Sequence, residues 1–397
     1  MRRSGAEAHG LVARDARVCM LRAPQHGWRV VEQFIALPTP SRAEVLVPIS
    51  RRPATAALRR FSNGSGGGAR LAAAATALAF SAGAGPLLRG RVSIAVDDSV
   101  ADAMLPDLVL CHRLRTELHD DRLELAVRMA ALRPNGKPVV QALSPDGSAI
   151  AFVKVGWNDL TCELVRREAQ RVTELTSSSA PRAFRVPRPM WAGPWAGHEV
   201  LAVESVDGDP TGLDPPLAAT AELAAIGGLS RSTLAESGWW TSVRERAGGA
   251  GPAAPDGRGR LGRAFAAVER RHGTRELVFG TSHGDWTPWN MAVRDGHLQV
   301  WDWERYATGV PVGIDVAHYL LLVRFRQQHR PIAEAIADVI ARVPAMMPEV
   351  GADAAAGEAI VELELLEMAV RYAEARAVGL NLGPDPFLDA LLELTAG

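Results

Sequence analysis

Hydrophobic and polar positions change their period about half-way along the chain. Up to about residue 206, short apolar runs with alternating polar positions and nearby turns predict strands. These runs are Val45–Ile49, Val92–Val96, Leu123–Met129, Val139–Leu143, Ala149–Val155 and Gly197–Glu204. After Pro210 the period becomes that of amphipathic helices. The predicted helices are Leu217–Ile226, Gly262–Arg271, Val312–Arg326, Pro331–Met346, Gly357–Val378 and Pro386–Leu394. The pattern therefore predicts an α+β chain that is strand-rich first and helical later.

The first 120 residues mix the two patterns. Besides two of the strands, they contain helix-like runs at Ala54–Phe61 and Arg70–Phe80. The glycine cluster Ser62–Gly68 joins these helices and is followed by no Gly-Lys-Ser/Thr, so it predicts a flexible connection rather than a phosphate loop. The uncharged run Leu71–Leu88 has the length of a membrane span, but its alanines and its late Gly and Pro favour a helix followed by a turn. We predict a small α/β extension of unknown role over residues 1–120.

The segment His283-Gly284-Asp285-Trp-Thr-Pro-Trp-Asn290 carries the clearest chemistry, with Asp302 twelve residues later. Between Asn290 and Asp302 the pattern is strand, Asp-Gly turn and strand, which predicts a hairpin. A hairpin brings its two ends together, so an amide and a carboxylate would face one another there. Carboxylates and an amide in this order suit metal-assisted phosphoryl transfer. The alternative is a hairpin that carries ordinary surface acids.

This segment resembles the aminoglycoside phosphotransferase and choline kinase-like family, which has a protein-kinase-like fold. The family shares His-Gly-Asp, four residues and Asn, and then a motif like Asp302-Trp-Glu. The resemblance implies that Asp285 is the catalytic base and that Asn290 and Asp302 bind Mg²⁺. It also implies that Asp315 braces the catalytic loop. We expect His283 to brace the same loop by hydrogen bonding, because Asp285 already fills the role of base.

Lys154 is one of only two lysines in a chain with 44 Lys and Arg residues. Arginine is used almost everywhere, so a lysine in a strand beside apolar side chains indicates a site that needs a compact ammonium group. The following helix, which we expect to begin at Asn158 or Asp159, carries Glu168 in an apolar stripe. The resemblance implies that Glu168 orients Lys154 and that Lys154 holds nucleotide phosphates. A strand lysine that merely reaches solvent is the alternative.

The resemblance covers roughly residues 120–397 and implies a bilobal arrangement. We predict a kinase-like N-lobe over residues 121–206 and a helical C-lobe over residues 207–397. Lys137 follows the single glycine of a turn that would cover the phosphates, although a simple hairpin turn is the alternative. Glu204 to Val206 match the family hinge, whose backbone would read the adenine edge. A surface strand that leads into a Gly turn is the alternative there.

Composition narrows the class of protein. The formal net charge is −1, so no excess of basic charge indicates nucleic-acid binding. The three cysteines are far apart and form no metal-binding or disulfide pattern, which favours buried thiols in a reducing compartment. The first residues lack the apolar core of a secretory signal. We therefore expect a cytoplasmic protein without a membrane partner, and nothing in the sequence indicates its oligomeric state.

The expected activity is a phosphotransferase that uses ATP, or alternatively GTP, with Mg²⁺. The acceptor is expected to be a small-molecule hydroxyl. From Gly280 onward there are 17 acidic residues against 8 arginines, which favours a cationic acceptor such as an aminoglycoside or a choline-like amine. Neutral sugars, nucleosides and amino-alcohols stay open. Trp286 and Trp289 are expected to wall the catalytic loop, with acceptor stacking by one of them as the alternative.

Two other classes of protein compete with this interpretation. A non-catalytic kinase-like protein would bind nucleotide or a partner without transfer, but such proteins typically lose one of the motif residues that are intact here. A metallohydrolase would use His283, Asp285 and Asp302 as ligands, but the sequence offers no second histidine at a convincing spacing, since His297 and His318 are isolated.

Overall fold

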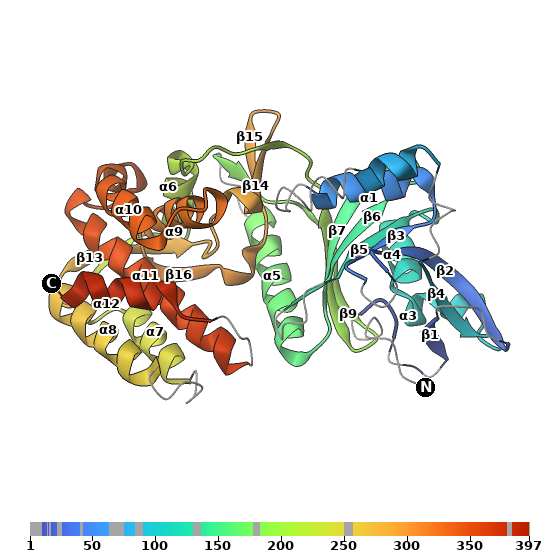
Figure 1. Ribbon diagram of the computed structural model, residues 1–397, viewed down its shortest axis with the longest axis horizontal. Helices are drawn as coiled ribbons and strands as arrows, with labels where there is room; N and C mark the ends of the chain where they lie inside the picture. Colours follow the sequence, from blue (N-terminus) through green and yellow to red (C-terminus); the bar gives the residue numbers. More distant parts are fainter. Residues whose placement is uncertain are drawn as a thin grey trace. The chain divides into compact units, whose positions relative to one another are not determined.

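A computed structural model gives the fold, and it describes residues 10–13, 15, 17–21, 26–39, 43–62, 75–83, 90–129, 136–177, 183–249, 257–378 and 383–396. The chain forms two compact units. The first unit is Met1–Glu174 with Pro187–Ser205, and the second is Leu175–Val186 with Val206–Gly397. Figure 1 shows their elements along the chain. The α+β class predicted from the sequence is confirmed, with antiparallel sheet in the first unit and mostly helix in the second.

The first unit contains, within its described residues, a nine-stranded antiparallel sheet of order β1-β4-β2-β3-β5-β6-β7-β10-β9. Its strands are β1 (Val18–Leu21), β2 (Trp28–Leu37), β3 (Val45–Pro48), β4 (Arg91–Asp97), β5 (Glu124–Arg128), β6 (Val139–Leu143), β7 (Ala149–Gly156), β9 (Pro189–Trp195) and β10 (His198–Glu204). Its helices are α1 (Arg51–Ser62), α3 (Leu105–Leu108), α4 (Leu110–Leu118) and α5 (Asp159–Ser177), with a short turn η3 (Asp102–Met104).

The N-terminal 120 residues contribute directly to this sheet. β3 pairs with β5 through Leu46 and Val127, so β1 to β4 extend the same sheet as β5 to β10. Alternate residues of β5 bury on opposite faces, with Ala126 against α1 and Leu125 among the residues that pack with α4. The first 120 residues and the strands that follow thus share one core on each face of one sheet, and the role of the extension stays open.

Helix α5 begins as the sequence predicts. The side-chain oxygen of Asn158 accepts a hydrogen bond from the backbone N–H of Thr161 at 2.8 Å, which caps the first turn. Val165, Glu168 and Val172 are buried at helical spacing, so Glu168 turns inward within an apolar stripe. A carboxylate in that position needs a partner, because an unpaired buried charge is strongly unfavourable.

The second unit is mostly helical. Its helices are α6 (Leu217–Ala225), α7 (Gly238–Gly249), α8 (Gly257–His272), α9 (Ile314–Leu322), the π-helix η6 (Val323–Gln327), α10 (Ile332–Met346), α11 (Gly357–Ala377) and α12 (Pro386–Ala396). Shorter turns are η4 (Pro288–Asn290), η5 (Trp303–Arg305), η7 (Met347–Val350) and η8 (Ala354–Ala356). α11 runs through the core, with buried residues on every side over most of its length. None of the described helices combines the length and the apolar character that crossing a membrane requires.

Two small sheets complete the second unit. One has the order β11-β14-β15-β8, with β8 (Phe184–Arg185), β11 (Asp209–Pro210), β14 (Met291–Arg294) and β15 (His297–Val300). The other has the order β12-β13-β16, with β12 (Ser230–Thr233), β13 (Glu276–Ser282) and β16 (Ala307–Pro311). β14 and β15 pair in the register Met291↔Val300, so the predicted hairpin is confirmed.

The other predicted strands and the C-terminal helices are confirmed to within a few residues at their ends. The sequence pattern did not predict the helices α3, α4 and α7 or the strands β1, β2, β8, β9, β11, β12, β13 and β16. Residues 75–80 of the predicted Arg70–Phe80 helix are helical, and residues 70–74 lie outside the described residues. The glycine connection after Ser62 also lies outside them.

Candidate functional site

The loop Ser282–Asp285 follows β13 and turns sharply at Gly284. Gly284 has φ of +78°, a left-handed conformation that side chains with a Cβ rarely adopt. A Cβ at this position would lie 2.6 Å from the carbonyl oxygen of Arg305. Conformation and close approach therefore both require glycine here, and the turn directs Asp285 away from the end of β13.

Asp315 holds this loop from the first turn of α9. Its carboxylate accepts hydrogen bonds from the backbone N–H of His283 at 2.9 Å and of Gly284 at 3.1 Å. It also accepts one from the hydroxyl of Ser282 at 2.9 Å. Asp315 is buried, and these three donors satisfy its carboxylate oxygens in the interior. Asp315 therefore holds the loop Ser282–Asp285 through three hydrogen bonds, and its part in a catalytic site stays a prediction.

His283 is completely buried, and both of its ring nitrogens have hydrogen-bond partners. Nδ1 accepts from the backbone N–H of Asp285 at 3.2 Å, and Nε2 donates to the carbonyl of Trp301 at 3.0 Å. Burial lowers the pKa of His283, which favours the neutral ring that this arrangement needs. His283 therefore ties the loop to the end of the hairpin. It has no lone pair left to bind a metal ion.

Asp285 and Asn290 are directly bonded. The amide nitrogen of Asn290 donates to the carboxylate Oδ2 of Asp285 at 2.8 Å and to the backbone carbonyl of Asp285 at 3.0 Å. Both amide protons are used, so the amide oxygen is the atom of Asn290 that remains for a cation. That oxygen and a carboxylate of Asp302 are hard donors of the type that Mg²⁺ prefers, so the residues fit this ion.

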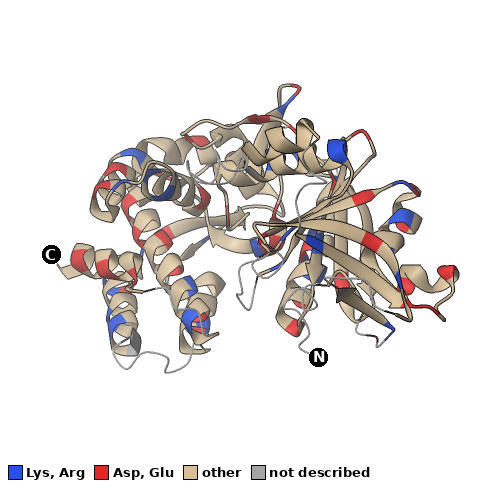
Figure 2. Cartoon of the chain, turned by 45° about the vertical axis from the view of Figure 1, so that its right-hand side comes forward, with Lys and Arg blue, Asp and Glu red and all other residues tan. Residues whose placement is uncertain are grey.

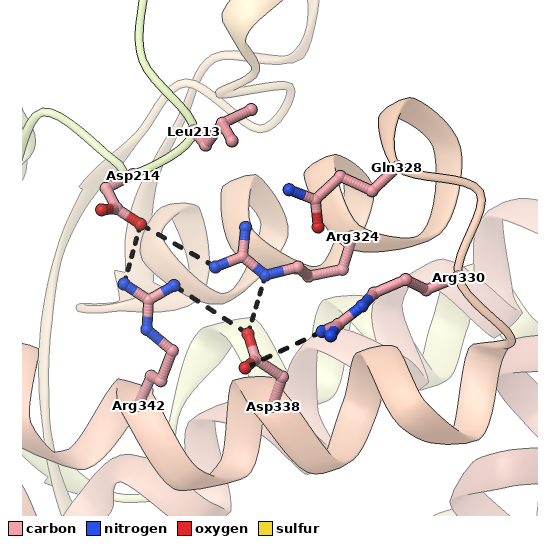
Figure 3. Close-up of a pocket in the computed structure, with 7 residues that line it drawn as sticks. All are labelled: Leu213, Asp214, Arg324, Gln328, Arg330, Asp338 and Arg342. Carbon is pink, nitrogen blue, oxygen red and sulfur yellow. Dashed lines mark hydrogen bonds and ion pairs between the residues drawn. The ribbon is translucent and has the colours of Figure 1, made fainter.

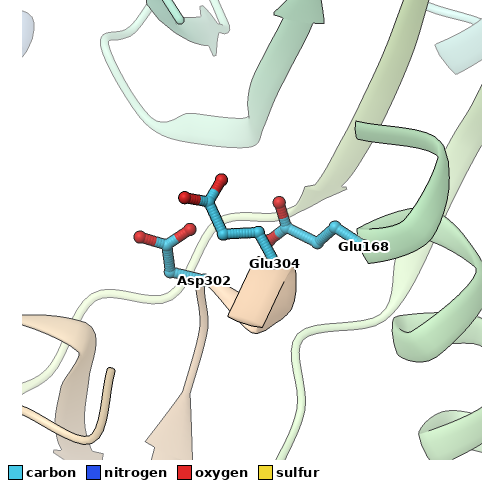
Figure 4. Close-up of side chains that lie close together, drawn as sticks. All are labelled: Glu168, Asp302 and Glu304. Carbon is cyan, nitrogen blue, oxygen red and sulfur yellow. The ribbon is translucent and has the colours of Figure 1, made fainter. Parts of the chain in front are cut away.

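Asp302 follows the hairpin at a strained position. The backbone N–H of Trp301 donates to the carbonyl of Asn290 at 3.0 Å and closes the open end of the hairpin. Asp302 then has φ of +71° and ψ of +54°, a left-handed conformation that is uncommon outside glycine and that Asp tolerates better than most residues. Its side chain and that of Glu304 project from the turn after β15, as Figure 4 shows. Strained backbone of this kind is concentrated at functional sites.

A histidine that the sequence pattern did not single out completes the surroundings of Asp285. His318 of α9 bonds through Nε2 to Oδ1 of Asp285 at 3.2 Å and through Nδ1 to Oε1 of Glu364 on α11 at 2.7 Å. Burial alone would lower the pKa of His318, but the carboxylates of Glu364 and Asp285 outweigh burial and raise that pKa to about 9. At neutral pH the ring is therefore a cation that donates to both carboxylates.

The charge of His318 acts back on Asp285. Burial would raise the pKa of Asp285, but the hydrogen bond and the charge of His318 outweigh burial and hold that pKa well below its ordinary value. Burial raises the pKa of Glu364, while His318 and Arg371 oppose this effect. Asp285 is therefore ionised at neutral pH.

Arg371 supports the loop from α11. Its guanidinium donates to the carbonyl of Gly284 at 2.7 Å and to Glu367 at 2.8 Å. Glu367 also pairs with Arg246 of α7, at 2.9 Å and 3.0 Å. Arg371, Glu367 and Arg246 each have a partner of opposite charge. Ionic groups in a protein interior require such partners. The loop Ser282–Asp285 is thus bonded, through the carbonyl of Gly284, to an arginine that ion pairs hold in place on α11.

The first unit holds the other candidate pair. Nζ of Lys154 on β7 lies 2.6 Å and 2.7 Å from the two carboxylate oxygens of Glu168 on α5. The side chain of Glu168 is 4% exposed and that of Lys154 is 22% exposed. A buried carboxylate therefore fixes the ammonium group, whose outer side stays accessible. The pairing of Lys154 with Glu168 is the contact that the resemblance implied.

The remaining predicted positions in the first unit are less constrained. Glu204 ends β10, and its backbone N–H donates to the carbonyl of Arg188 at 2.9 Å. The chain passes from the first unit to the second between Ser205 and Val206. Lys137 is half-buried next to Gly136, whose carbonyl accepts from the Trp157 indole at 2.7 Å. These contacts neither assign nor remove a nucleotide role for Glu204, Val206 or Lys137.

The two tryptophans of the loop have different environments. Trp286 is fully buried and packs edge-on against His283 with ring centroids 5.6 Å apart. Trp303 packs on the same histidine at 4.6 Å. Trp289 is 42% exposed. Only Trp286 therefore walls the loop, and Trp289 is the tryptophan that remains available to a ligand.

A pocket of about 390 Å³ lies elsewhere in the second unit. It is lined by Leu213, Asp214, Arg324, Gln328, Arg330, Asp338 and Arg342 (Figure 3). Arg324 donates to Asp338 at 2.8 Å, and Arg342 pairs with Asp214 at 2.7 Å. The two carboxylates of the pocket thus pair with its guanidinium groups and tie the segment after β11 to α10.

The excess of acidic residues in the second unit is only partly a surface property. Acidic and basic positions are interspersed along its helices (Figure 2). Glu362, Glu364 and Glu367 of α11 are buried, and each has a basic partner or a histidine. The argument for a cationic acceptor from net charge is therefore weaker than the sequence count suggested.

Comparison with known proteins gives matches among solved structures. No family model matches the chain, and no curated protein matches its sequence. The chain is similar to a fructosamine-3-kinase from Haemophilus somnus 129PT, with 13% identity, 72% of this chain and 95% of that chain covered, and a TM-score of 0.43. An amicoumacin kinase bound to AMP-PNP and Ca²⁺ has 14% identity, 68% and 88% coverage, and a TM-score of 0.41. An aminoglycoside 2′-phosphotransferase in complex with GDP has 15% identity, 71% and 95% coverage, and a TM-score of 0.44.

The candidate residues fall into two groups, one in each unit. Asp285, Asn290, His283 and Asp315 contact one another or the same loop, and Lys154 contacts Glu168. Sequence reasoning missed His318, Glu364 and Arg371. Three glutamates within the apolar run of α11 were a usable signal, because a helix that is apolar on all sides buries any charge it carries and each such charge needs a partner.

Proposed function

We propose that the protein is a protein-kinase-like phosphotransferase that moves the γ-phosphoryl group of ATP to a hydroxyl group of a small molecule. The observation that carries this proposal is the environment of Asp285. Its carboxylate is ionised, is bonded to the amide of Asn290 at 2.8 Å, and follows a loop that Asp315 braces. A fixed, ionised carboxylate next to a candidate metal ligand is what positioning of an alcohol for phosphoryl transfer requires.

In this mechanism Asp285 orients the acceptor hydroxyl and receives its proton. The oxygen of the hydroxyl forms a bond to the γ-phosphorus while the bond to the β–γ bridging oxygen breaks, and ADP leaves. Each carboxylate oxygen has two lone pairs, so the hydrogen bonds from His318 and Asn290 leave positions for the acceptor. Since the transition state is loose, orientation contributes more than proton abstraction.

The oxygen of Asn290 and the carboxylate of Asp302 would hold Mg²⁺. The ion, when bound, neutralises charge on the transferring phosphoryl group. The bond from the Asn290 amide to Asp285 orients the amide oxygen, and the hairpin fixes its distance from Trp301 and Asp302. Glu304 is a further carboxylate on the same turn.

Lys154 would hold the nucleotide phosphates, and Glu168 would set its position. A lysine serves here because its ammonium group is compact and fits between a buried carboxylate and a phosphate. The backbone groups of Glu204 to Val206 would read the adenine edge. GTP is the alternative nucleotide, since backbone groups discriminate between the two bases only by the pattern of donors and acceptors.

Two alternatives differ in testable ways. A non-catalytic nucleotide-binding protein would keep the same contacts and transfer nothing. A metallohydrolase with His283 as a ligand is disfavoured, because both ring nitrogens of His283 are used in hydrogen bonds. Its activity would need Zn²⁺ or Mn²⁺ and no nucleotide.

The test is a screen of Mg²⁺- and ATP-dependent ADP release against hydroxyl-bearing compounds, namely aminoglycosides, choline-like amines, sugars, nucleosides and amino-alcohols. Acceptor-dependent ADP release with a phosphorylated product supports the proposal. Stoichiometric binding of ATP without turnover of any acceptor would support the non-catalytic alternative. Hydrolysis of phosphoesters without nucleotide would support the metallohydrolase.

A further inference from the structure

A row of three charged side chains, negative, positive and negative, runs from Asp285 through His318 to Glu364. Oδ1 of Asp285 lies 3.2 Å from Nε2 of His318, and Nδ1 of His318 lies 2.7 Å from Oε1 of Glu364. The side chains of His318 and Glu364 are 2% and 1% exposed, whereas that of Asp285 is 28% exposed. The carboxylate of Asp285 is therefore accessible to a ligand, whereas that of Glu364 is buried on α11.

The groups around His318 come from two elements. Asp285 faces it from the loop after β13, and Glu364 faces it from α11. Arg371, one turn of α11 beyond Glu367, acts on both Glu364 and Asp285 and bonds to the carbonyl of Gly284. The ring therefore lies between two carboxylates whose other charged neighbours are fixed. A charge-assisted hydrogen bond of this kind has a narrow range of geometries.

We propose that His318, seated on Glu364, is a positioning residue that fixes one oxygen of Asp285 and keeps this carboxylate directed at the acceptor hydroxyl. This inference rests on the proposed function and adds His318 and Glu364 to the residues that serve it. His318 donates one N–H to each carboxylate, so it has no free position for a further proton. The proton of the acceptor therefore stops on Asp285, and His318 neither gains nor loses one during transfer.

Asn290 and His318 have complementary tasks in this arrangement. Asn290 bonds to Oδ2 and His318 bonds to Oδ1, so the two donors fix the plane of the carboxylate. A carboxylate held by only one of them can rotate about its Cβ–Cγ bond. Since positioning contributes most of the rate in a loose transition state, rotation would lower kcat more than it would change the KM of either substrate.

Replacing one partner alone is a poor test. Removal of His318 leaves Glu364 as a buried charge without its cation, and the variant could then fail to fold. The paired substitution His318→Leu with Glu364→Gln avoids this. The cation is removed together with its carboxylate, so no unpaired charge stays in the core, while Asp285 loses its donor to Oδ1 and keeps the Asn290 donor to Oδ2.

The chain offers a matched control on the same helix. Nε2 of His272 lies 3.0 Å from Oε2 of Glu362, and both side chains are buried. Glu362 is on α11, as Glu364 is, but neither His272 nor Glu362 contacts Asp285 in any described hydrogen bond. The variant His272→Leu with Glu362→Gln therefore makes the same chemical change in the same core and leaves the carboxylate of Asp285 untouched.

The experiment has two readouts. In the first, ¹⁵N NMR of the histidine rings follows the charge of His318 with pH, in the full-length protein and in the variants Glu364→Gln and Asp285→Asn. We expect a doubly protonated ring at pH 7.5 that loses a proton near pH 9, and a lower midpoint in both variants. A ring that is neutral at pH 7.5 in the wild type overturns the proposal. This readout needs no activity.

The second readout is steady-state kinetics at saturating Mg²⁺. We expect kcat of the paired His318/Glu364 variant to fall by about tenfold or more, with the KM of ATP and acceptor changed by less than about threefold, and the His272/Glu362 control to stay within about twofold of wild type. Equal kcat in the two paired variants overturns the positioning role. A charged His318 in a protein that transfers no phosphate overturns the proposed function, whereas a neutral His318 in an active enzyme overturns the positioning role alone.

Discussion

The amide nitrogen of Asn290 lies 2.8 Å from the carboxylate Oδ2 of Asp285. This bond joins the proposed base to a proposed metal ligand, because the same amide has its oxygen free to face a cation. The two proposed roles of Asn290, to orient Asp285 and to bind Mg²⁺, can therefore be separated by substitution.

Asn290→Asp keeps an oxygen ligand for the metal and removes the N–H donor. Two carboxylates would then lie at hydrogen-bond distance, and their repulsion would displace Asp285. We expect kcat to fall by about a hundredfold while Mg²⁺ dependence is retained, as measured by initial rates over a Mg²⁺ titration. Asn290→Ala should lose both properties. Equal Mg²⁺ requirements and equal rates in the two variants would refute the double role.

Lys154→Met should lower phosphoryl transfer by about a hundredfold or more, because the ammonium group no longer neutralises the nucleotide phosphates. Met has a similar length and cannot pair with Glu168, so the double variant Lys154→Met with Glu168→Gln removes the unpaired carboxylate. We expect the double variant to unfold at a temperature close to that of wild type and still to lack activity. Near-normal kcat/KM for ATP in the double variant would remove Lys154 from the mechanism.

Gly284→Ala should destabilise the fold by about 2 kcal/mol or more, since it combines a left-handed backbone with a clash against the Arg305 carbonyl. Gly296, in the turn of the β14–β15 hairpin, is the matched control. Its φ is +74° and no atom lies within 4 Å of a Cβ placed there. Gly296→Ala should lower the free energy of unfolding only through its left-handed backbone, by about 1 kcal/mol. Urea unfolding of both variants measures the difference, and equal midpoints would contradict the packing argument.

The ionic contacts behind the loop predict how stability depends on pH. Burial would raise the pKa of Glu367, but Arg371 and Arg246 outweigh burial and lower that pKa to about 2. A folded-state pKa below the unfolded value contributes stability above the unfolded pKa. This contribution, on the order of 3 kcal/mol, is lost as the pH falls from about 4.5 towards 2.

Glu367→Gln should remove this part of the acid unfolding. The exposed pair Arg231–Glu276 supplies the control, and Glu276→Gln should leave the profile nearly unchanged. Chemical unfolding between pH 2 and pH 7 measures both. A Glu367→Gln profile parallel to that of wild type would show that the buried pair does not contribute in this way.

Local pattern predicted much of the fold and part of the site. The β14–β15 hairpin and helices α10 and α11 follow from periodicity and turn residues, because these signals are contained within a short stretch of sequence. The contact between Asp285 and Asn290 is also local, five residues apart. The Lys154–Glu168 contact was implied by the family resemblance, whereas the local pattern only placed Glu168 in the apolar stripe of the following helix.

Contacts between distant segments could not be predicted in the same way. His318 and Glu364 are 46 residues apart, and no spacing rule connects a histidine on one helix with a glutamate on another. Strand β2 was missed because Arg29, Glu32 and Gln33 interrupt its apolar pattern, whereas its place between β4 and β3 is decided by pairing with distant strands. Tertiary pairing, which sequence periodicity does not encode, decided both cases.

The central claim is that Asp285 is the base of a phosphoryl transfer. The most direct measurement is transfer of the γ-phosphoryl group from labelled ATP to an accepted hydroxyl compound, compared between wild type and Asp285→Asn with nucleotide binding measured in parallel. The account predicts a phosphorylated product with wild type, a loss of about a hundredfold or more in the variant, and unchanged binding of ATP. Transfer at a wild-type rate by Asp285→Asn would contradict the account.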